Sequence, residues 1–231
     1  MIDFASNIRP VGYPSSVTFF IICGLTLLTV IKYNFGKNIK EAFLSFFNYR
    51  QALRMFEERR ESDRHAAILS FILFSLVVGI FISLIFPFFG VTMPLWGSQE
   101  LSILFFSTIT GLLYILKAYI WQALGVIFMA QALSKIYVYN MFLYNRNTGL
   151  MIFPLVAIIP YVAEGMIPYI VYSVIIVFIL SYFFKLFRIF QIINDQNVSV
   201  FHFILYLCTL EILPLLLFIK GCKALSESVI M

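Results

Sequence analysis

The sequence predicts an all-α protein that crosses a membrane several times as a polytopic bundle of helices. Of its 231 residues, 62% are hydrophobic and only 12% are charged, whereas soluble domains are about half apolar and a quarter charged. The apolar residues form long runs, and a soluble fold would leave much of this surface in water. We therefore expect a single integral membrane domain over 1–231, with about six transmembrane helices and one or two amphipathic interfacial helices.

Six apolar runs have, or approach, the roughly 20 residues that a membrane-spanning helix needs. The run 148–163 is short, but closing the loop to Pro168 extends it. Residues 125–146 are half polar and predict a second interfacial or re-entrant helix, with a seventh span over 125–144 as the alternative. In chain order, the six runs cover residues 17–33, 66–89, 101–122, 148–163, 169–187 and 200–219.

The segment between the first two runs, residues 37–60, has the pattern of an amphipathic helix that lies along the cytoplasmic membrane surface. Apolar side chains recur at helical spacing, and charged side chains fill much of the remaining surface. One interpretation is a helix packed on the bundle and anchored by anionic lipid. The other is a docking face for a partner protein, formed by Phe43, Phe46, Leu53, Arg54 and Phe56.

The basic residues predict how the chain is oriented, because loops rich in Lys and Arg stay in the cytoplasm. Residues 32–64 carry eight of them and the loop 90–100 carries none, which places 32–64 inside and the N-terminus outside. Six spans put four further basic residues inside, whereas a seventh span would leave most of these outside. We therefore favour six spans. The four residues are Lys135, Arg146, Lys185 and Arg188.

Glu211 stands in the middle of the last apolar run, with Pro214 one turn later. A carboxylate at mid-membrane costs a few kcal/mol, about 3 on insertion scales, so such groups face the bundle interior or water. Transporters often place an ion or proton site beside a broken helix, but a hydrogen-bonded Glu that fixes the last helix is the alternative. We expect Glu211 to face the bundle and to bond to Tyr114, Thr110 or Lys117 on the run 101–122.

No motif in the sequence predicts catalysis or a cofactor. There is no metalloprotease, nucleophile-elbow, phosphate-loop or dinucleotide-binding pattern, and the three widely spaced cysteines predict neither a disulfide framework nor a zinc site. We expect no catalytic residue, no metal, no cofactor and no nucleic-acid partner, since the net charge of +5 comes mostly from one segment. The expected partners are membrane lipids and other inner-membrane proteins.

Two functional hypotheses follow. The first is a non-enzymatic subunit or assembly factor of a larger membrane complex that serves protein insertion, secretion or the cell envelope. It is motivated by the lack of catalytic motifs, the small soluble portions and the aromatic-rich segment 37–60. The second is a small ion- or proton-coupled transporter that uses Glu211. An enzyme acting on lipid ranks third.

Three stretches of the chain carry a distinctive set of residues. They are Gln51, Leu53 and Arg54 in "YRQALRMF", Asn145, Gly149 and Pro154 in "YNRNTGLMIFPL", and Tyr206, Cys208, Leu210, Glu211 and Pro214 in "LYLCTLEILPL". Together these stretches resemble a family of small polytopic inner-membrane proteins of Bacteroidota that share a domain of unknown function, and the likeness runs from about Phe46 to Lys220. The resemblance implies a multi-pass protein of a Gram-negative inner membrane and makes Glu211 part of a signature, but it carries no activity or cofactor.

Overall fold

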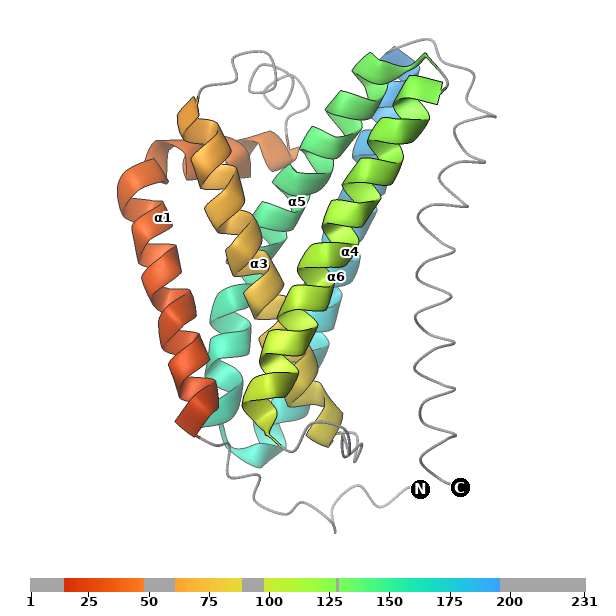
Figure 1. The fold of residues 1–231 in the computed structure, drawn as a ribbon. Helices are drawn as coiled ribbons and strands as arrows, with labels where there is room; N and C mark the ends of the chain where they lie inside the picture. Colours follow the sequence, from red (N-terminus) through yellow and green to blue (C-terminus); the bar gives the residue numbers. More distant parts are fainter. Residues whose placement is uncertain (1–14, 48–60, 89–97, 128, 196–231) are drawn as a thin grey trace, which may run out of the picture. The chain divides into compact units, whose positions relative to one another are not determined.

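The structure is a computed structural model that describes residues 15–47, 61–88, 98–127 and 129–195, and all regular elements within these ranges are helical (Figure 1). Five of these helices are long and apolar enough to cross a membrane. This confirms the expected all-α membrane bundle, while the sixth expected span, 200–219, lies outside the described residues. The long helices are α1 (Ser15–Phe47), α3 (Glu61–Phe88), α4 (Gln99–Ile127), α5 (Gln131–Ile158) and α6 (Ile167–Asp195).

Two short 3₁₀ helices, Ile159–Tyr161 and Glu164–Met166, connect α5 to α6. Pro160 stands at the start of the first of them, and Pro168 stands at the start of α6, where its missing N–H has no helical partner to lose. The chain divides into two units, Met1–Lys185 and Leu186–Met231. The packing described below belongs to the first unit.

Helix α1 bends at Phe35, whose backbone (φ −130°, ψ 25°) is not helical. Figure 1 shows the last part of α1 leaving the direction of its first part, which is the candidate span Val17–Gly36. This last part is the beginning of the amphipathic helix expected over 37–60, and residues 48–60 lie outside the described part of the chain. Beyond the bend, Ser45 is fully buried while Phe43 and its neighbour Leu44 are about half exposed.

Helices α4 and α5 form a hairpin whose turn includes Met129 and Ala130, and this corrects two expectations. The half-polar segment 125–146 is not one interfacial helix, and 148–163 is not a separate span, because α4 continues to Ile127 and α5 runs unbroken from Gln131 to Ile158 within one candidate span. A seventh span would need a loop between residues 144 and 148, where the chain is helical. Ser134, Asn140, Asn145 and Arg146 of this segment are buried, whereas Gln131 and Lys135, near the hairpin turn, are exposed. Composition alone therefore misplaced the four buried residues.

The hairpin is fixed by a compact set of contacts at its turn. Met129 has a positive φ of 53°, and the Ala130 N–H donates to the Gly125 carbonyl at 2.8 Å. The Ser134 hydroxyl donates to the Trp121 carbonyl at 2.7 Å. A Cβ at position 125 would collide with Ser134, so glycine is required for the two helices to approach this closely.

Helices α3 and α5 are the central helices of the described bundle. In one apolar stretch of 18 residues from each span, 56% and 61% of the residues are buried, against 22% for α1 and α6 and 11% for α4, and α3 contacts α1, α4 and α5. The crossing of α3 and α4 is close because Gly79 has no side chain: a Cβ there would lie 2.7 Å from the backbone nitrogen of Ser107. Small residues at such crossings are the usual means by which membrane helices pack.

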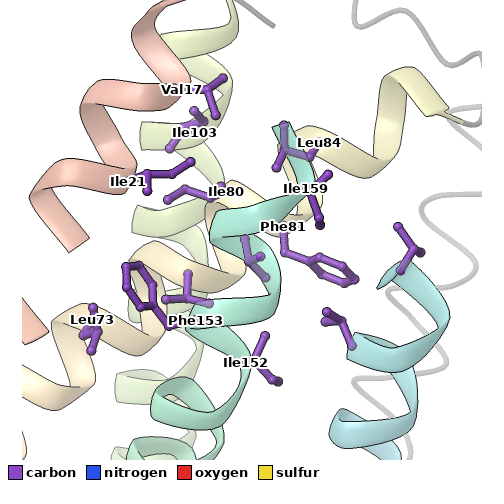
Figure 2. Close-up of a cluster of buried hydrophobic side chains, with 14 of the residues drawn as sticks. Val17, Ile21, Leu73, Ile80, Phe81, Leu84, Ile103, Ile152, Phe153 and Ile159 are labelled. Atoms are coloured by element: carbon purple, nitrogen blue, oxygen red, sulfur yellow. The ribbon is translucent and has the colours of Figure 1, made fainter. Parts of the chain in front are cut away.

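The apolar core lies mainly toward one end of the bundle, and Figure 2 shows part of it in close-up. It gathers side chains from the beginning of α1, α4 and α6 and from the end of α3 and α5. Buried polar side chains are concentrated instead in the middle and the opposite half of α5. Labelled core residues in Figure 2 are Val17, Ile21, Leu73, Ile80, Phe81, Leu84, Ile103, Ile152, Phe153 and Ile159.

The outward-facing surface combines exposed apolar side chains with hydroxyl groups that are bonded within their own helix. Thr29 donates to the Leu25 carbonyl at 2.8 Å, and Ser173 donates to the Tyr169 carbonyl at 2.8 Å. A hydroxyl bonded in this way needs no partner from its surroundings and is tolerated in hydrocarbon. Together with the apolar spans, this surface identifies the chain as a multi-pass membrane protein.

Candidate functional site

The middle of α5 carries four consecutive buried polar residues, Asn145, Arg146, Asn147 and Thr148, which we call the α5 polar segment. Arg146 lies fifteen residues from either end of the candidate span Gln131–Tyr161, which is about 22 Å at a helical rise of 1.5 Å per residue. Its side chain is only 5% exposed. The expectation that Arg146 lies on the cytoplasmic side, at the end of an interfacial or re-entrant helix over 125–146, is therefore wrong, because the residue lies at the centre of a candidate span.

An arginine at this depth is costly, by about 3 kcal/mol on insertion scales. Such residues face the interior of a bundle, where other helices supply polar partners, and they mark candidate functional sites. The other three side chains of the segment, one before Arg146 and two after it, are buried to a similar degree. The α5 polar segment is therefore the strongest candidate site in the described part of the chain.

Asn145 faces the junction of α3, α4 and α5. Ser134 bonds to Trp121 of α4 and therefore lies on the face of α5 that meets α4. Asn145 comes eleven residues after Ser134, a spacing that places it within about 20° of that face. Asn145 also lies one turn before Gly149, and Gly149 packs on Phe74 of α3. Asn145 therefore lies on the side of α5 between α3 and α4.

Arg146 and Asn147 face two other directions. The ring of Phe153 fills the space beside Gly24 of α1, so Phe153 lies on the face of α5 toward α1. Arg146 comes seven residues before Phe153 and lies within about 20° of the same face. Asn147 lies two residues before Gly149 and is therefore turned about 160° away from the α3-facing side. Because consecutive residues of a helix are about 100° apart around its axis, the side chains of Asn145, Arg146 and Asn147 lie on three different sides of α5.

Helix α4 brings two of the predicted site residues to the same depth. Thr110 is buried and stands eleven residues before Trp121, on the face that meets α5. The ring of Tyr114 packs edge-on against Phe74 of α3, with 5.4 Å between ring centroids. Lys117 is half-buried one turn further toward the hairpin. Thr110 and Tyr114 therefore lie level with the α5 polar segment.

Several buried polar atoms at this depth have no hydrogen-bond partner among the described residues. They include Nδ2 of Asn145 on α5 and Oγ of Ser75 on α3. Asn140 donates from Nδ2 to the Ile136 carbonyl at 2.9 Å, while its Oδ1 is likewise without a partner in the described ranges. Unsatisfied buried groups cost about 1–3 kcal/mol each, so these positions point to further bonding groups.

Of the remaining predicted site residues, only some belong to the described part of the chain. Glu211 lies outside the described residues, so its expected bonds to Tyr114, Thr110 or Lys117 stay predictions. In the predicted docking face, Phe43 is exposed. The side chain of Phe46 and the residues Leu53, Arg54 and Phe56 lie outside the described part.

The α5 polar segment was not predicted as a site from the sequence. Asn145 entered it only through the family resemblance, and Arg146 only as a topology marker. The available signal was the absence of any Gly or Pro between residues 131 and 148, which favours one continuous helix over a helix and a loop. In the described residues, no group of three or more His, Cys, Asp or Glu side chains is placed to hold a metal ion.

The comparison with protein families gives one result. The family model described as "Domain of unknown function (DUF4271)" matches residues 17–222. This range begins in α1 and covers nearly the whole chain, so it is wider than the range 46–220 over which the motifs were noticed, and it confirms the likeness to an uncharacterised family. No curated protein and no solved structure matches the chain.

Proposed function

We propose that this chain, which belongs to the DUF4271 family, is a non-enzymatic subunit or assembly factor of a larger complex in the inner membrane. The carrying observation is the divergence of Asn145, Arg146 and Asn147 around α5. A solute site gathers a few polar groups toward one point, whereas polar groups that point to different neighbouring helices stabilise helix–helix contacts. The arrangement of the α5 polar segment therefore supports a structural role better than a transport pathway.

The last part of α1 supports partner docking. Beyond the bend at Phe35, this helix leaves the direction of the span, buries Ser45, and exposes Phe43 and Leu44. It also begins the predicted cytoplasmic amphipathic segment 37–60. We assign the docking face to this segment and place the complex in protein insertion, secretion or maintenance of the cell envelope.

Co-purification in a mild detergent tests this proposal. We expect the tagged chain to elute with other membrane proteins in fixed proportion, and Phe43→Ser combined with Leu44→Ser to lose them. The matched control is Met166→Ser, which changes a residue that is 60% exposed between α5 and α6. Elution of the tagged chain alone, or equal loss of partners in the control, would contradict the proposal.

The second candidate function is an ion- or proton-coupled transporter that uses Glu211. The observation in its favour is that buried polar groups from two helices lie at the middle of the spans. Thr110 of α4 lies at the same depth as Arg146 of α5. Flux into liposomes that contain the purified chain tests it. A transporter requires a cation-dependent or pH-dependent flux that Glu211→Gln abolishes without loss of folding, since an amide does not titrate.

A further inference from the structure

We propose that the junction of α3, α4 and α5 binds one carboxyl group in the membrane interior, through Ser75, Thr110 and Asn145. This inference goes beyond the subunit role and does not depend on it. The site is defined by one polar side chain from each of three helices. Its ligand is identified by the hydrogen-bonding capacity and the charge of these surroundings.

The three side chains lie at nearly the same depth. Counted from the hairpin turn at residue 129, Thr110 is nineteen residues back and Asn145 is sixteen residues on, a difference of about 4.5 Å along the helix axes. Ser75 lies beside the residue that follows Thr110, because its Oγ is 3.5 Å from the position of a Cβ on Gly111. The α3–α4 crossing and the α4–α5 hairpin therefore converge on this junction.

Two of these side chains have bonding capacity to offer. Asn145 is 6% exposed and Ser75 is 7% exposed, and neither the amide nitrogen of the first nor the hydroxyl of the second has a hydrogen-bond partner among the described residues. Thr110 adds a buried hydroxyl. An amide nitrogen and hydroxyl groups donate hydrogen bonds, so the junction presents donors to a ligand that accepts.

The charge of the neighbouring residue favours an acceptor with negative charge. The guanidinium of Arg146, the residue next to Asn145 on α5, is always charged, and a positive charge in the poorly polarisable interior of the bundle favours an anion over a neutral ligand. The depth excludes lipid phosphate, because the centre of the hydrocarbon core is about 15 Å from either headgroup region. A carboxyl group attached to an apolar carrier satisfies all of these conditions.

Such a carboxyl group has two sources. One is an acidic side chain on a membrane helix, and Glu211 is the only Asp or Glu within the six apolar runs of the sequence. The other is an apolar carboxylic acid dissolved in the bilayer. Both present the same chemistry to the junction, and two arms of one experiment distinguish them.

The experiment follows thermal unfolding of the purified full chain in lipid nanodiscs by intrinsic tryptophan fluorescence. The first arm compares Asn145→Leu, Glu211→Leu and the double variant. If Glu211 is the source, each single change lowers Tm by several degrees, and the double variant is no lower than the worse single one. Thr110→Val, which keeps its shape, replaces Asn145→Leu if that variant does not fold.

The second arm adds dodecanoate or its neutral analogue dodecanol to the wild-type chain. If an apolar acid is the source, dodecanoate raises Tm, dodecanol does not, and Asn145→Leu removes the difference. Thr29→Val is the control in both arms because its hydroxyl is exposed and already bonded to its own helix. Additive losses in the first arm together with no dodecanoate-specific shift in the second overturn the proposal. Partner capture through Phe43 and Leu44 is unaffected by either result.

Discussion

Gly149 of α5 packs directly on the backbone of Phe74 of α3: a Cβ at position 149 would lie 3.0 Å from both Cα and Cβ of Phe74. This contact joins the two most buried helices of the bundle one turn from Asn145. The same Phe74 ring also packs against Tyr114 of α4. One phenylalanine therefore connects three helices at the depth of the α5 polar segment, and the rotation of α5 about its axis depends on it.

Replacement of Gly149 by Leu forces α5 away from α3, because the two nearest atoms, Cα and Cβ of Phe74, are fixed by the backbone and cannot rotate aside. We expect a loss of about 1–3 kcal/mol in the free energy of unfolding, as for other overpacked sites. Thermal unfolding in nanodiscs measures it. A variant with wild-type Tm would show that the two helices do not meet at this point.

Replacement of Gly79 by Ala tests the crossing of α3 and α4. The added methyl group would collide with Ser107, so we expect Tm to fall and the two helices to separate locally. Gly36→Ala is the matched control, since no atom lies within 4 Å of its Cβ position. Equal effects at positions 79 and 36 would count against the close crossing.

Replacement of Arg146 by Ala removes a buried charge from the centre of a span. Breaking an established buried polar contact costs about 3–5 kcal/mol, so we expect strongly reduced accumulation in the membrane, measured by immunoblot of membrane fractions. Lys32→Ala is the control because this side chain is exposed at the end of the first part of α1. Normal accumulation of the Arg146 variant would place residue 146 at a membrane surface.

The described helices could largely be predicted from the sequence, because long apolar runs leave few alternatives in a membrane. The middle of α5 could not. Asn140, Asn145, Arg146 and Asn147 lower its hydropathy, and this effect is the same whether a helix lies at the membrane surface or is surrounded by protein. Only the packing of α5 against α1, α3 and α4 distinguishes the two cases.

The candidate site was predicted in part, for a related reason. Thr110 and Tyr114 were identified because depth along a span can be counted from its ends. Their neighbours on α5 were missed because the count depends on where the hairpin turns, and Gly125 fixes that turn through a contact with Ser134. A contact across the hairpin is not visible in the spacing of either helix alone.

Glu211 gives a prediction that separates the two candidate functions. If the role of Glu211 is structural, Glu211→Gln hardly changes Tm, because the amide keeps the shape and most hydrogen bonds. Glu211→Leu then lowers both Tm and accumulation in the membrane. In a transporter, Glu211→Gln abolishes flux while folding is intact. Paired measurement of Tm and flux distinguishes these outcomes, and we expect the structural one.

The central claim is that α5 crosses the membrane as one helix with the α5 polar segment buried at its centre. Thiol accessibility tests it most directly, in a chain whose native residues Cys23, Cys208 and Cys222 are replaced by Ala. Single cysteines are placed at Lys135, Asn147 and Tyr161, and intact and opened vesicles are treated with a charged, membrane-impermeant reagent. The account predicts labelling of positions 135 and 161 from opposite sides and none at 147, which is 1% exposed in the wild-type chain. Labelling of position 147, or labelling of 135 and 161 from the same side, would contradict it.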